Sequence, residues 1–376
     1  MWKIQLFKLN FDQSESDAVN KVLESGWLTM GEQISAFESD FSSFLGGKSY
    51  CTAVSSGTAA LHMALLALDI KSGDEVIIPA LTFVADANVV RMVGGTPVLA
   101  DCGSIDNWNI TAESIERKLT PKTTAVIIVH YAGYPCDMPA IVELCKRKNI
   151  RLIEDVAHAP GANVNNISCG IWGDIGCFSF FSNKNLSMGE GGMVVTLNEK
   201  LNQRLRFLRS HGMTALTLDR HRGRAITYDV AEPGLNYRMD EIRAAIGLVQ
   251  LKKLPRGNDR RKELTELYRS NFNGSKVLMP FSLLSYKNIS SYHILPILLP
   301  ENVDRLLVID FLKARGIQSS IHYPPFWGFT AYAGQFSPED APIAAEISKR
   351  ELTLPLFPTM KNEEVNVVTS TLLESL

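Results

Sequence analysis

Long hydrophobic runs, paired cysteines and an excess of charge of either sign are all missing from this chain of 376 residues. No apolar stretch approaches the ~18 to 20 residues that a membrane-spanning helix needs. The formal net charge of −2 gives no general attraction for nucleic acid or for an anionic membrane. The basic residues form no tail, and no DNA-binding segment is evident. We therefore expect neither nucleic acid nor a membrane among the partners.

The six cysteines are scattered along the chain. They lack the CxxC spacing of a zinc site, so we expect no metal. The first residues do not have the pattern of a signal peptide. We therefore expect a cytoplasmic protein with free thiols.

The length of the chain predicts two lobes, because single cores usually stop growing at ~250 to 300 residues. Seven short apolar runs punctuate the first half of the sequence. Their continuous hydrophobicity is typical of strands that are buried on both faces of a sheet. The runs are Thr52–Ser56, Val76–Pro79, Pro97–Asp101, Ala125–His130, Arg151–Asp155, Cys177–Phe181 and Met193–Thr196.

Helical stretches such as Ala140–Lys148 separate several of these runs, so an α/β fold with a seven-stranded, mostly parallel sheet is predicted. The large domain should cover residues 1–238, and a linking helix with a smaller α/β domain should cover residues 239–376. In the second part we expect helices at Met239–Leu254, Val303–Arg315 and Pro342–Leu352, and strands at Ser290–Leu299 and Gln318–His322.

Lys184 stands out among the lysines because it follows the buried strand Cys177–Phe181 and precedes a glycine turn at Glu190-Gly191-Gly192. A primary amine held at a strand end can form a Schiff base with pyridoxal phosphate once it loses its proton. That cofactor also needs a carboxylate at its ring nitrogen and a cradle for its phosphate.

Asp155 is the candidate for the ring nitrogen, because it ends the strand Arg151–Asp155 and ligands bind beyond the carboxyl ends of parallel strands. The alternative is that Asp155 caps a following helix. The phosphate cradle is predicted at Gly57, Thr58 and Ala59, where a strand gives way to a helix with free N–H groups. Ser179 could add a hydroxyl. The alternative there is a plain helix start.

The order of these motifs closely resembles the DegT/DnrJ/EryC1/StrS family, which comprises sugar aminotransferases of the fold-type-I pyridoxal-phosphate class. The motifs are Ser-Gly-Thr-Ala-Ala-Leu from Ser56, Thr82-Phe83-Val84-Ala85, Glu154-Asp155-Val156-Ala157-His158, and Phe178-Ser179-Phe180 leading to Lys184. The likeness extends from Gly26–Gly31 through Asn236–Met239 to His322–Pro325 and Leu354–Leu356. Two positions depart from the pattern and could lie near the substrate: Asp86 and Phe326-Trp327.

The resemblance implies a role for each matching residue. Lys184 is then the cofactor lysine and proton carrier, Asp155 the partner of the ring nitrogen, and His158 a residue beside the ring. Phe83 stacks on the other face of the ring. The phosphate is bound by Gly57, Thr58, Ala59 and Ser179, together with Asn236 from the neighbouring subunit of a homodimer with shared active sites.

By the same resemblance, the reaction moves an amino group from glutamate through pyridoxamine phosphate to a nucleotide-linked keto sugar. A 4-keto-6-deoxyhexose is favoured, and the amino sugar would serve polysaccharide, glycan or antibiotic biosynthesis. His293, His322 and Tyr323 could line the sugar. His130 is expected to be structural or substrate-lining. The segment Arg220–Arg224 is either a solvated charge run or a diphosphate site.

Two other functions stay open. One is a pyridoxal-phosphate sugar dehydratase or lyase, although family members of that kind have histidine at the position of Lys184. The other is a cofactor-bound sensor without enzymatic activity.

Overall fold

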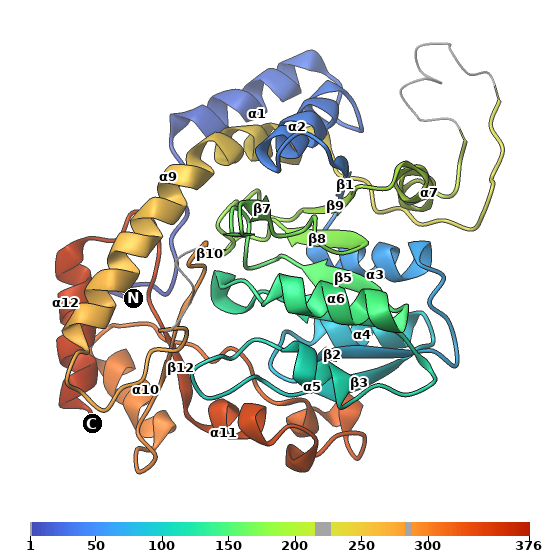
Figure 1. Cartoon of the computed structure of the whole chain (residues 1–376). Coiled ribbons are helices and arrows are strands. Elements are labelled where there is room, and N and C mark those ends of the chain that lie inside the picture. The colour runs from blue at the N-terminus through green and yellow to red at the C-terminus, as the bar shows by residue number, and fades with distance from the viewer. Residues whose placement is uncertain (1, 215–226, 283–287) are drawn as a thin grey trace.

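The computed structural model describes residues 2–214, 227–282 and 288–376 (Figure 1). The arginine-rich segment at 220–224 lies outside the described residues, so both interpretations of it stay open.

A seven-stranded sheet forms the centre of the larger lobe (Figure 1), with the strand order β1-β9-β8-β5-β4-β2-β3. Strand β9 is antiparallel to both of its neighbours, and the other pairs are parallel. The predicted α/β class with a mostly parallel sheet is confirmed, and the ends of the seven predicted strands differ from the observed ends by two residues at most. The strands are β1 (Tyr50–Val54), β2 (Glu75–Pro79), β3 (Thr96–Ala100), β4 (Thr123–Val129), β5 (Arg151–Asp155), β8 (Ile175–Ser179) and β9 (Gly192–Thr196).

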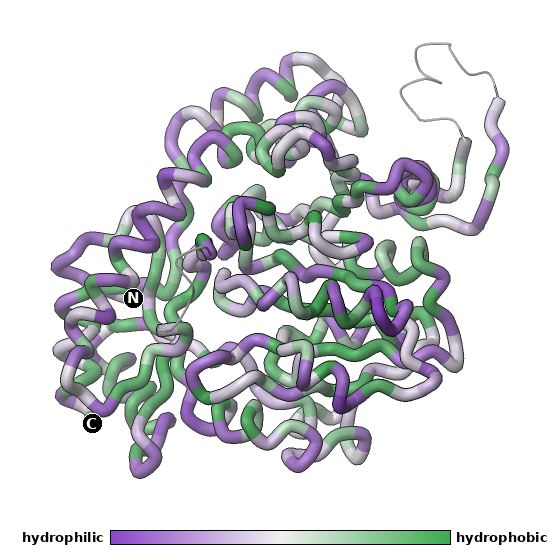
Figure 2. Tube along the Cα trace, viewed as in Figure 1, coloured by the Kyte–Doolittle hydropathy of each residue, from purple (hydrophilic) through white to green (hydrophobic). Residues whose placement is uncertain are grey.

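Helices cover both faces of this sheet (Figure 1), and a short ribbon of β6 (Asn163–Val164), β7 (Ile167–Ser168) and β10 (Asn288–Ile289) lies beside it. Figure 2 shows hydrophobic residues concentrated on the central strands and hydrophilic ones on the outlying helix α7. The helices of this lobe are α1 (Gln13–Ser25), α2 (Glu32–Phe44), α3 (Gly57–Ala67), α4 (Ala85–Met92), α5 (Ala112–Glu116), α6 (Met138–Lys148) and α7 (Glu199–Arg209).

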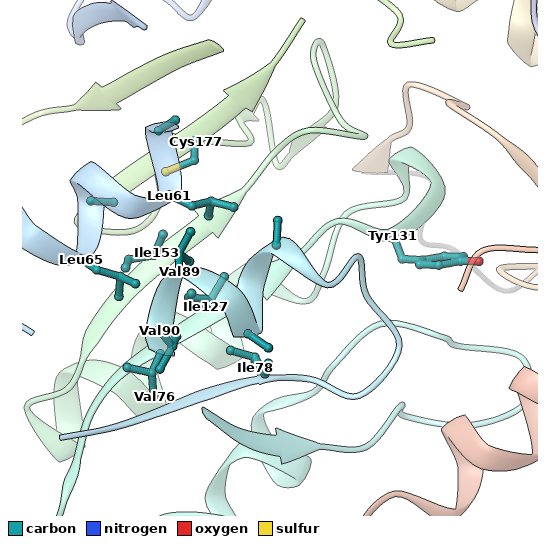
Figure 3. Close-up of a cluster of buried hydrophobic side chains, with 14 of the residues drawn as sticks. Leu61, Leu65, Val76, Ile78, Val89, Val90, Ile127, Tyr131, Ile153 and Cys177 are labelled. Carbon is teal, nitrogen blue, oxygen red and sulfur yellow. The ribbon is translucent and has the colours of Figure 1, made fainter. Parts of the chain in front are cut away.

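Alternate residues of each central strand serve two different cores. On β2, Val76 and Ile78 pack with Leu61 and Leu65 of α3 (Figure 3). Ile77 lies between them and belongs to the core beneath α5 and α6. Because successive side chains of a strand point to opposite faces, an unbroken apolar run is what a sheet covered on both sides requires.

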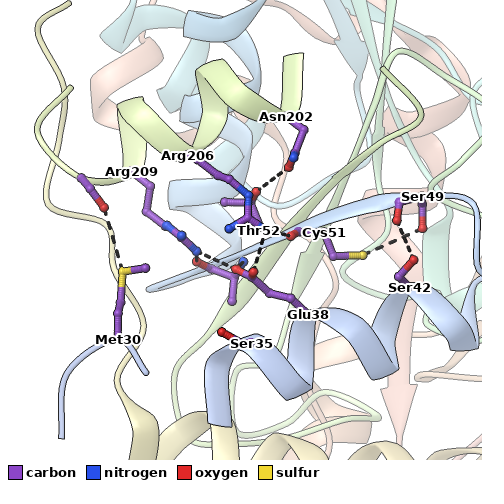
Figure 4. A network of polar contacts seen from close by, with 12 residues as sticks. Met30, Ser35, Glu38, Ser42, Ser49, Cys51, Thr52, Asn202, Arg206 and Arg209 are labelled. Carbon is purple, nitrogen blue, oxygen red and sulfur yellow. Dashed lines mark hydrogen bonds and ion pairs between the residues drawn. The ribbon is translucent and has the colours of Figure 1, made fainter. Parts of the chain in front are cut away.

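A buried ion-pair cluster fixes α7 and α2 to the edge strand β1 (Figure 4). Arg209 Nη1 lies 2.7 Å from Glu38 Oε1 and donates to the carbonyl of Ala53 at 2.9 Å. Arg206 Nη2 bonds the other carboxylate oxygen at 2.8 Å. A buried charge is costly unless it is paired, so the cluster holds β1 in place just before the start of α3.

The smaller lobe has its own core, built on the long helix α9 (Glu241–Asn271) and the strand pair β11 (Leu295–Leu298) and β12 (Glu351–Leu354). Helices α10 (Arg305–Ala314), α11 (Pro342–Arg350) and α12 (Asn362–Glu374) complete it. Ile4 from the beginning of the chain also packs in this core and pairs with Ile317. The domain boundary at residue 238 stays a prediction.

Several predicted elements of the smaller lobe are wrong in extent. The helix expected at Pro342–Leu352 ends at Arg350, because Glu351 is already extended and begins β12. The predicted strand Gln318–His322 is reduced to an isolated bridge between Ser320 and Thr353. A short apolar run does not by itself distinguish helix from strand, and pairing with β11 decides the outcome here.

Two other predicted ends also shift. The strand expected at Ser290–Leu299 is confined to β11, with β10 beginning earlier at Asn288. The linking helix continues beyond Leu254 to Asn271, through Pro255. A proline within a helix removes one backbone hydrogen bond, and the packing of Leu264 and Tyr268 in the small-lobe core offsets that loss.

Candidate active site

A cavity of about 350 Å³ lies at the carboxyl ends of β4, β5 and β8, next to the start of α3. Seven of the nine predicted site residues line it: Gly57, Thr58, Phe83, Asp155, His158, Ser179 and Lys184. His322 and Tyr323 of the smaller lobe form its far wall. A larger groove of about 730 Å³ between α1, α2 and α9 contains none of the nine. The predicted site residues therefore lie together at the smaller cavity.

Lys184 reaches this cavity from the turn after β8. Its N–H donates to the carbonyl of Phe181 at 2.9 Å, which closes that turn. Burial lowers the pKa of the Lys184 amine to about 8, although the nearby Asp155 carboxylate acts in the opposite direction. At pH 7 roughly a tenth of the amine is therefore unprotonated, and this form is the nucleophile.

Asp155 ends β5 and is nearly buried. Its Oδ1 accepts the N–H of Ala157 at 2.8 Å. Burial raises the pKa of the Asp155 carboxyl, against the opposing effects of the Ala157 hydrogen bond and of Lys184. The alternative that Asp155 caps a helix is wrong, because residues 156–162 form turns before β6. Among the described residues, Asp155 has no second hydrogen-bond partner, which leaves its other oxygen for a ligand in the cavity.

Asp86 is a second acid near Asp155. It is fully buried in the first turn of α4, where Thr82 donates its hydroxyl to Oδ2 at 2.5 Å. Its Oδ1 is buried and has no hydrogen-bond partner among the described residues. Burial and the neighbouring Asp155 raise the pKa of Asp86 well above its usual value. Burial therefore favours the protonated, neutral form of Asp86.

The start of α3 forms the predicted phosphate cradle. A Cβ on Gly57 would stand 2.7 Å from Ser179 Cβ, so only glycine lets the helix begin this close to β8. Ser56 caps the helix by accepting the Ala59 N–H at 3.0 Å. Ala59 does not line the cavity, which leaves Gly57, Thr58 and Ser179 to face it.

His158 is held by two hydrogen bonds on opposite sides of its ring. Nδ1 accepts the N–H of Ala132 at 3.2 Å, and Nε2 lies 2.8 Å from the hydroxyl of Tyr323. Burial and the nearby Lys184 lower the pKa of His158 well below its usual value, so the ring is neutral. Because a backbone N–H can only donate, the ring proton is on Nε2. Phe83 lines the same cavity, with its ring centre 5.7 Å from that of Tyr323, and is half exposed.

Three other residues named from the sequence lie elsewhere. Asn236 is exposed and does not line the cavity within one chain. Phe326, a departure from the family pattern that could lie near the substrate, is instead buried against Tyr332 and Phe336, because its large ring fills the core beside α11. His130 is fully buried, with Nε2 3.2 Å from Glu154, which favours the structural alternative.

Sequence reasoning missed the contacts made by Thr82 and Tyr131. Thr82 lines the cavity and reaches Asp86, a pairing that the spacing of four residues could have indicated. The hydroxyl of Tyr131 donates to the carbonyl of His322. That contact joins positions 191 residues apart, and no local pattern predicts it.

An aldehyde cofactor with a phosphate and a basic ring nitrogen fits these residues: an amine with a lowered pKa, a carboxylate one strand away and a helix N-terminus opened by glycine. On this sheet, the arrangement belongs to the fold-type-I pyridoxal-phosphate enzymes. Residues 10–373 match the sequence model of the DegT/DnrJ/EryC1/StrS aminotransferase family. The chain belongs to that family and is an aminotransferase, as the sequence predicted.

Solved structures agree with this assignment over the whole chain. The aminotransferase TlmJ from Streptoalloteichus hindustanus is 32% identical, with a TM-score of 0.90 over 100% of this chain and 98% of that one. Helicobacter pylori PseC, an aminotransferase of pseudoaminic acid biosynthesis, is 29% identical, with a TM-score of 0.91 over 99% and 98%.

A Streptococcus pneumoniae protein described as a sugar aminotransferase is 30% identical in its PMP form, with a TM-score of 0.90 over 96% of each chain. It is also known in a PLP form. The predicted cofactor pair, pyridoxal and pyridoxamine phosphate, is confirmed for the family. Among the described residues, no helix has the length and apolar character needed to cross a membrane.

Proposed function

We propose that this aminotransferase moves an amino group from glutamate to a nucleotide-linked keto sugar, a 4-keto-6-deoxyhexose. The observation that carries the proposal is the cavity in which Lys184 and Asp155 face a wall of His158, His322 and Tyr323. Neutral imidazole and phenol groups suit the hydroxyls of a sugar.

Relatives support the sugar class. The pneumococcal neighbour is described as a sugar aminotransferase, and PseC serves the biosynthesis of pseudoaminic acid. Lys184 is present where sugar dehydratases of this family have histidine, so the lyase alternative is disfavoured. The amino sugar would enter polysaccharide, glycan or antibiotic biosynthesis.

Each residue that lines the cavity would have a role set by its position. The cofactor, when bound, supplies an aldehyde and an electron sink. Lys184 would hold that aldehyde and would carry the proton at its Nζ in both half-reactions. The Asp155 carboxylate would keep the proton on the ring nitrogen, and His158 and Phe83 would confine the ring.

The phosphate contacts would come from Gly57, Thr58 and Ser179. The helix N-terminus supplies N–H donors and a favourable dipole there. The N–H of Ala59 would join only if Ser56 released it, because the Ser56 hydroxyl accepts it in this structure.

The active site is proposed to be shared between two chains of a homodimer. Asn236 is exposed and lies outside the cavity of its own chain, so it is available to a partner's phosphate site. A mixture of inactive Lys184→Ala and inactive Asn236→Asp chains should regain activity, because one site of the hybrid dimer receives both intact residues. Verified hybrid dimers that stay inactive would reject the shared site.

The decisive test of the substrate offers a panel of nucleotide-linked keto sugars to the pyridoxamine-phosphate form of the enzyme. We expect 4-keto-6-deoxy sugars to restore the absorbance of the pyridoxal-phosphate form, with free keto acids as the comparison. Restoration by keto acids alone would reject the sugar as substrate.

The proposed location is the cytosol. All six cysteines are free and buried. This state is typical of a reducing compartment. Fractionation of the native host cells, with the enzyme followed by an antibody, would check it.

A further inference from the structure

A buried acid in the smaller lobe has no part in the functions described so far. Glu351 begins β12 and is fully buried. Burying a carboxyl is costly unless its oxygens are hydrogen-bonded. Both oxygens of Glu351 are bonded, and both bonds lead towards the active-site cavity rather than to solvent.

The hydrogen bonds form a relay from Glu351 to a histidine of the cavity wall. Oε2 accepts the backbone N–H of His322 at 2.9 Å. Oε1 lies 2.5 Å from the Thr353 hydroxyl, and that hydroxyl lies 2.9 Å from Nδ1 of His322. His322 itself lines the cavity with Lys184 and Tyr323. The described residues make no hydrogen bond to its Nε2.

The direction of the protons along this relay depends on Glu351. If Glu351 is protonated, the proton is on Oε1, because Oε2 faces a donor. Oε1–H then donates to Thr353, Thr353 donates to Nδ1, and the proton of the neutral imidazole is on Nε2. If Glu351 is ionised, Thr353 donates to Oε1 instead. Nδ1–H then donates to Thr353, and Nε2 is a bare acceptor.

The surroundings of Glu351 favour a change between its protonated and ionised states at mildly alkaline pH, while the His322 ring stays neutral. Burial raises the pKa of Glu351 to about 8, against the opposing effects of the Thr353 hydroxyl, the His322 N–H and the Arg305 charge. Burial and the Lys184 charge lower the pKa of His322 to about 4.

Other titratable groups face this pair. Tyr131 and Tyr323 adjoin Glu351, and burial raises the pKa of both phenols well above its usual value. His158 and His293 adjoin His322, and burial lowers the pKa of both rings well below its usual value. These four groups therefore stay neutral while Glu351 titrates.

We propose that Glu351 is a positioning residue that acts through Thr353 to set which nitrogen of His322 carries the proton. With Glu351 protonated, His322 presents an N–H donor at Nε2 to an oxygen of the substrate. With Glu351 ionised, Nε2 becomes an acceptor, and a substrate oxygen without a proton loses its partner. The substrate part of this inference rests on the proposed sugar; the tautomer part does not.

The tautomer is measured directly by ¹⁵N NMR of the holoenzyme labelled at its histidines, with the His322→Gln variant used to assign the His322 signals. In the wild type, we expect the Nε2–H form below pH 8 to give way to the Nδ1–H form above it. An Nδ1–H form at every pH from 6.5 to 9.5 would overturn the proposal, and so would an Nε2–H form throughout.

Glu351→Gln is the matched variant. Its amide oxygen must face the His322 N–H, so its NH₂ group faces Thr353 and imitates the protonated acid at every pH. We expect the Nε2–H form to persist to pH 9.5. Thr353→Val cuts the relay, and the pH-dependent change of tautomer should disappear. A wild-type transition that survives in either folded variant would overturn the proposal.

Substrate binding provides the second measurement, made on the keto sugar that the panel identifies. At pH 9, the KM of Glu351→Gln should be about fivefold lower than that of the wild type, the worth of one hydrogen bond. At pH 6.5 the two should agree. The comparison is made at equal pH because Lys184 also titrates near pH 8. Equal KM values at pH 9 would reject the contact with substrate.

The two tests separate the inference from the proposed function. Failure of every sugar in the panel would remove the proposed substrate and leave the NMR result to decide the role of Glu351. An unchanged tautomer with an active sugar would remove the role of Glu351 and leave the proposed function standing.

Discussion

Glu154 and Asp155 are neighbouring acids at the end of the same strand, yet they meet opposite environments. Glu154 is fully buried on the side of the sheet away from the cavity. Its oxygens accept three backbone N–H groups, from Gly170, Trp172 and Gly173, each at 2.8 Å. Asp155 lines the cavity and accepts one, from Ala157. Alternation along a strand thus separates a structural acid from a functional one.

The difference shows that the number of hydrogen-bond donors around a buried carboxylate determines whether it is structural or available to a ligand. Three N–H groups and His130 satisfy Glu154 completely, so it fixes the loop that follows β7 and has no capacity left for a ligand. Asp155 leaves one oxygen available to the cavity, and burial raises the pKa of its carboxyl. Each acid should therefore respond to an isosteric amide in a different measurement.

The largest effect is expected for Asp155→Asn. Turnover should fall by roughly a hundredfold to a thousandfold, the usual loss when one preorganised electrostatic contact is removed. Cofactor affinity should fall by only ~1.5 to 3 kcal/mol, the worth of one charge-assisted hydrogen bond. Steady-state rates at saturating cofactor check this. Near-normal turnover would remove the distinction between the two acids.

Glu154→Gln should lower the free energy of unfolding and leave turnover unchanged. The amide nitrogen cannot accept an N–H, so a buried donor of the loop is orphaned at a cost of about 1 to 3 kcal/mol in the free energy of unfolding. The folded variant should retain its turnover per active site. Urea unfolding with active-site titration measures both quantities, and Asp155→Asn is the matched control, with unfolding expected to change little.

Asp86→Asn tests the third acid through the pH dependence of the free energy of unfolding. Between its usual pKa of 3.8 and its raised folded pKa, Asp86 keeps its proton in the folded state and loses it in the unfolded state. Stability therefore falls as pH rises through this window, by about 1.4 kcal/mol for each unit of pKa shift. The variant should lose that part of the slope. Unfolding of cofactor-free protein at pH 4.5 and pH 8 checks it, and identical slopes would contradict the raised pKa.

The sequence predicted the central sheet well because each strand is an unbroken apolar run, as a doubly covered sheet requires. It predicted β12 poorly. Lys349, Arg350 and Glu351 all have good helix propensity, so the helical pattern of α11 continues into this strand, and only the pairing with β11 excludes a longer helix. The local sequence pattern therefore predicts the strands that are buried along their whole length. It fails where pairing with a distant strand decides between helix and strand.

The candidate site shows the same division. The gathering of Lys184, Asp155 and Gly57 in one place was predictable because each stands at or just beyond the end of an element, and element ends are visible in the sequence. The relay from Glu351 to His322 was not predictable, because it joins residues 29 and 31 positions apart through side chains. Asp86 was noticed as a departure from the family pattern, but its burial beside Asp155 required the structure.

The most direct test of the account is to find the lysine that holds the cofactor. Borohydride reduction of the enzyme with bound pyridoxal phosphate fixes the cofactor to its lysine, and peptide mapping identifies the labelled residue. The account predicts the label on Lys184, with none left on the Lys184→Ala variant. A label on any other lysine of the wild-type enzyme would contradict it.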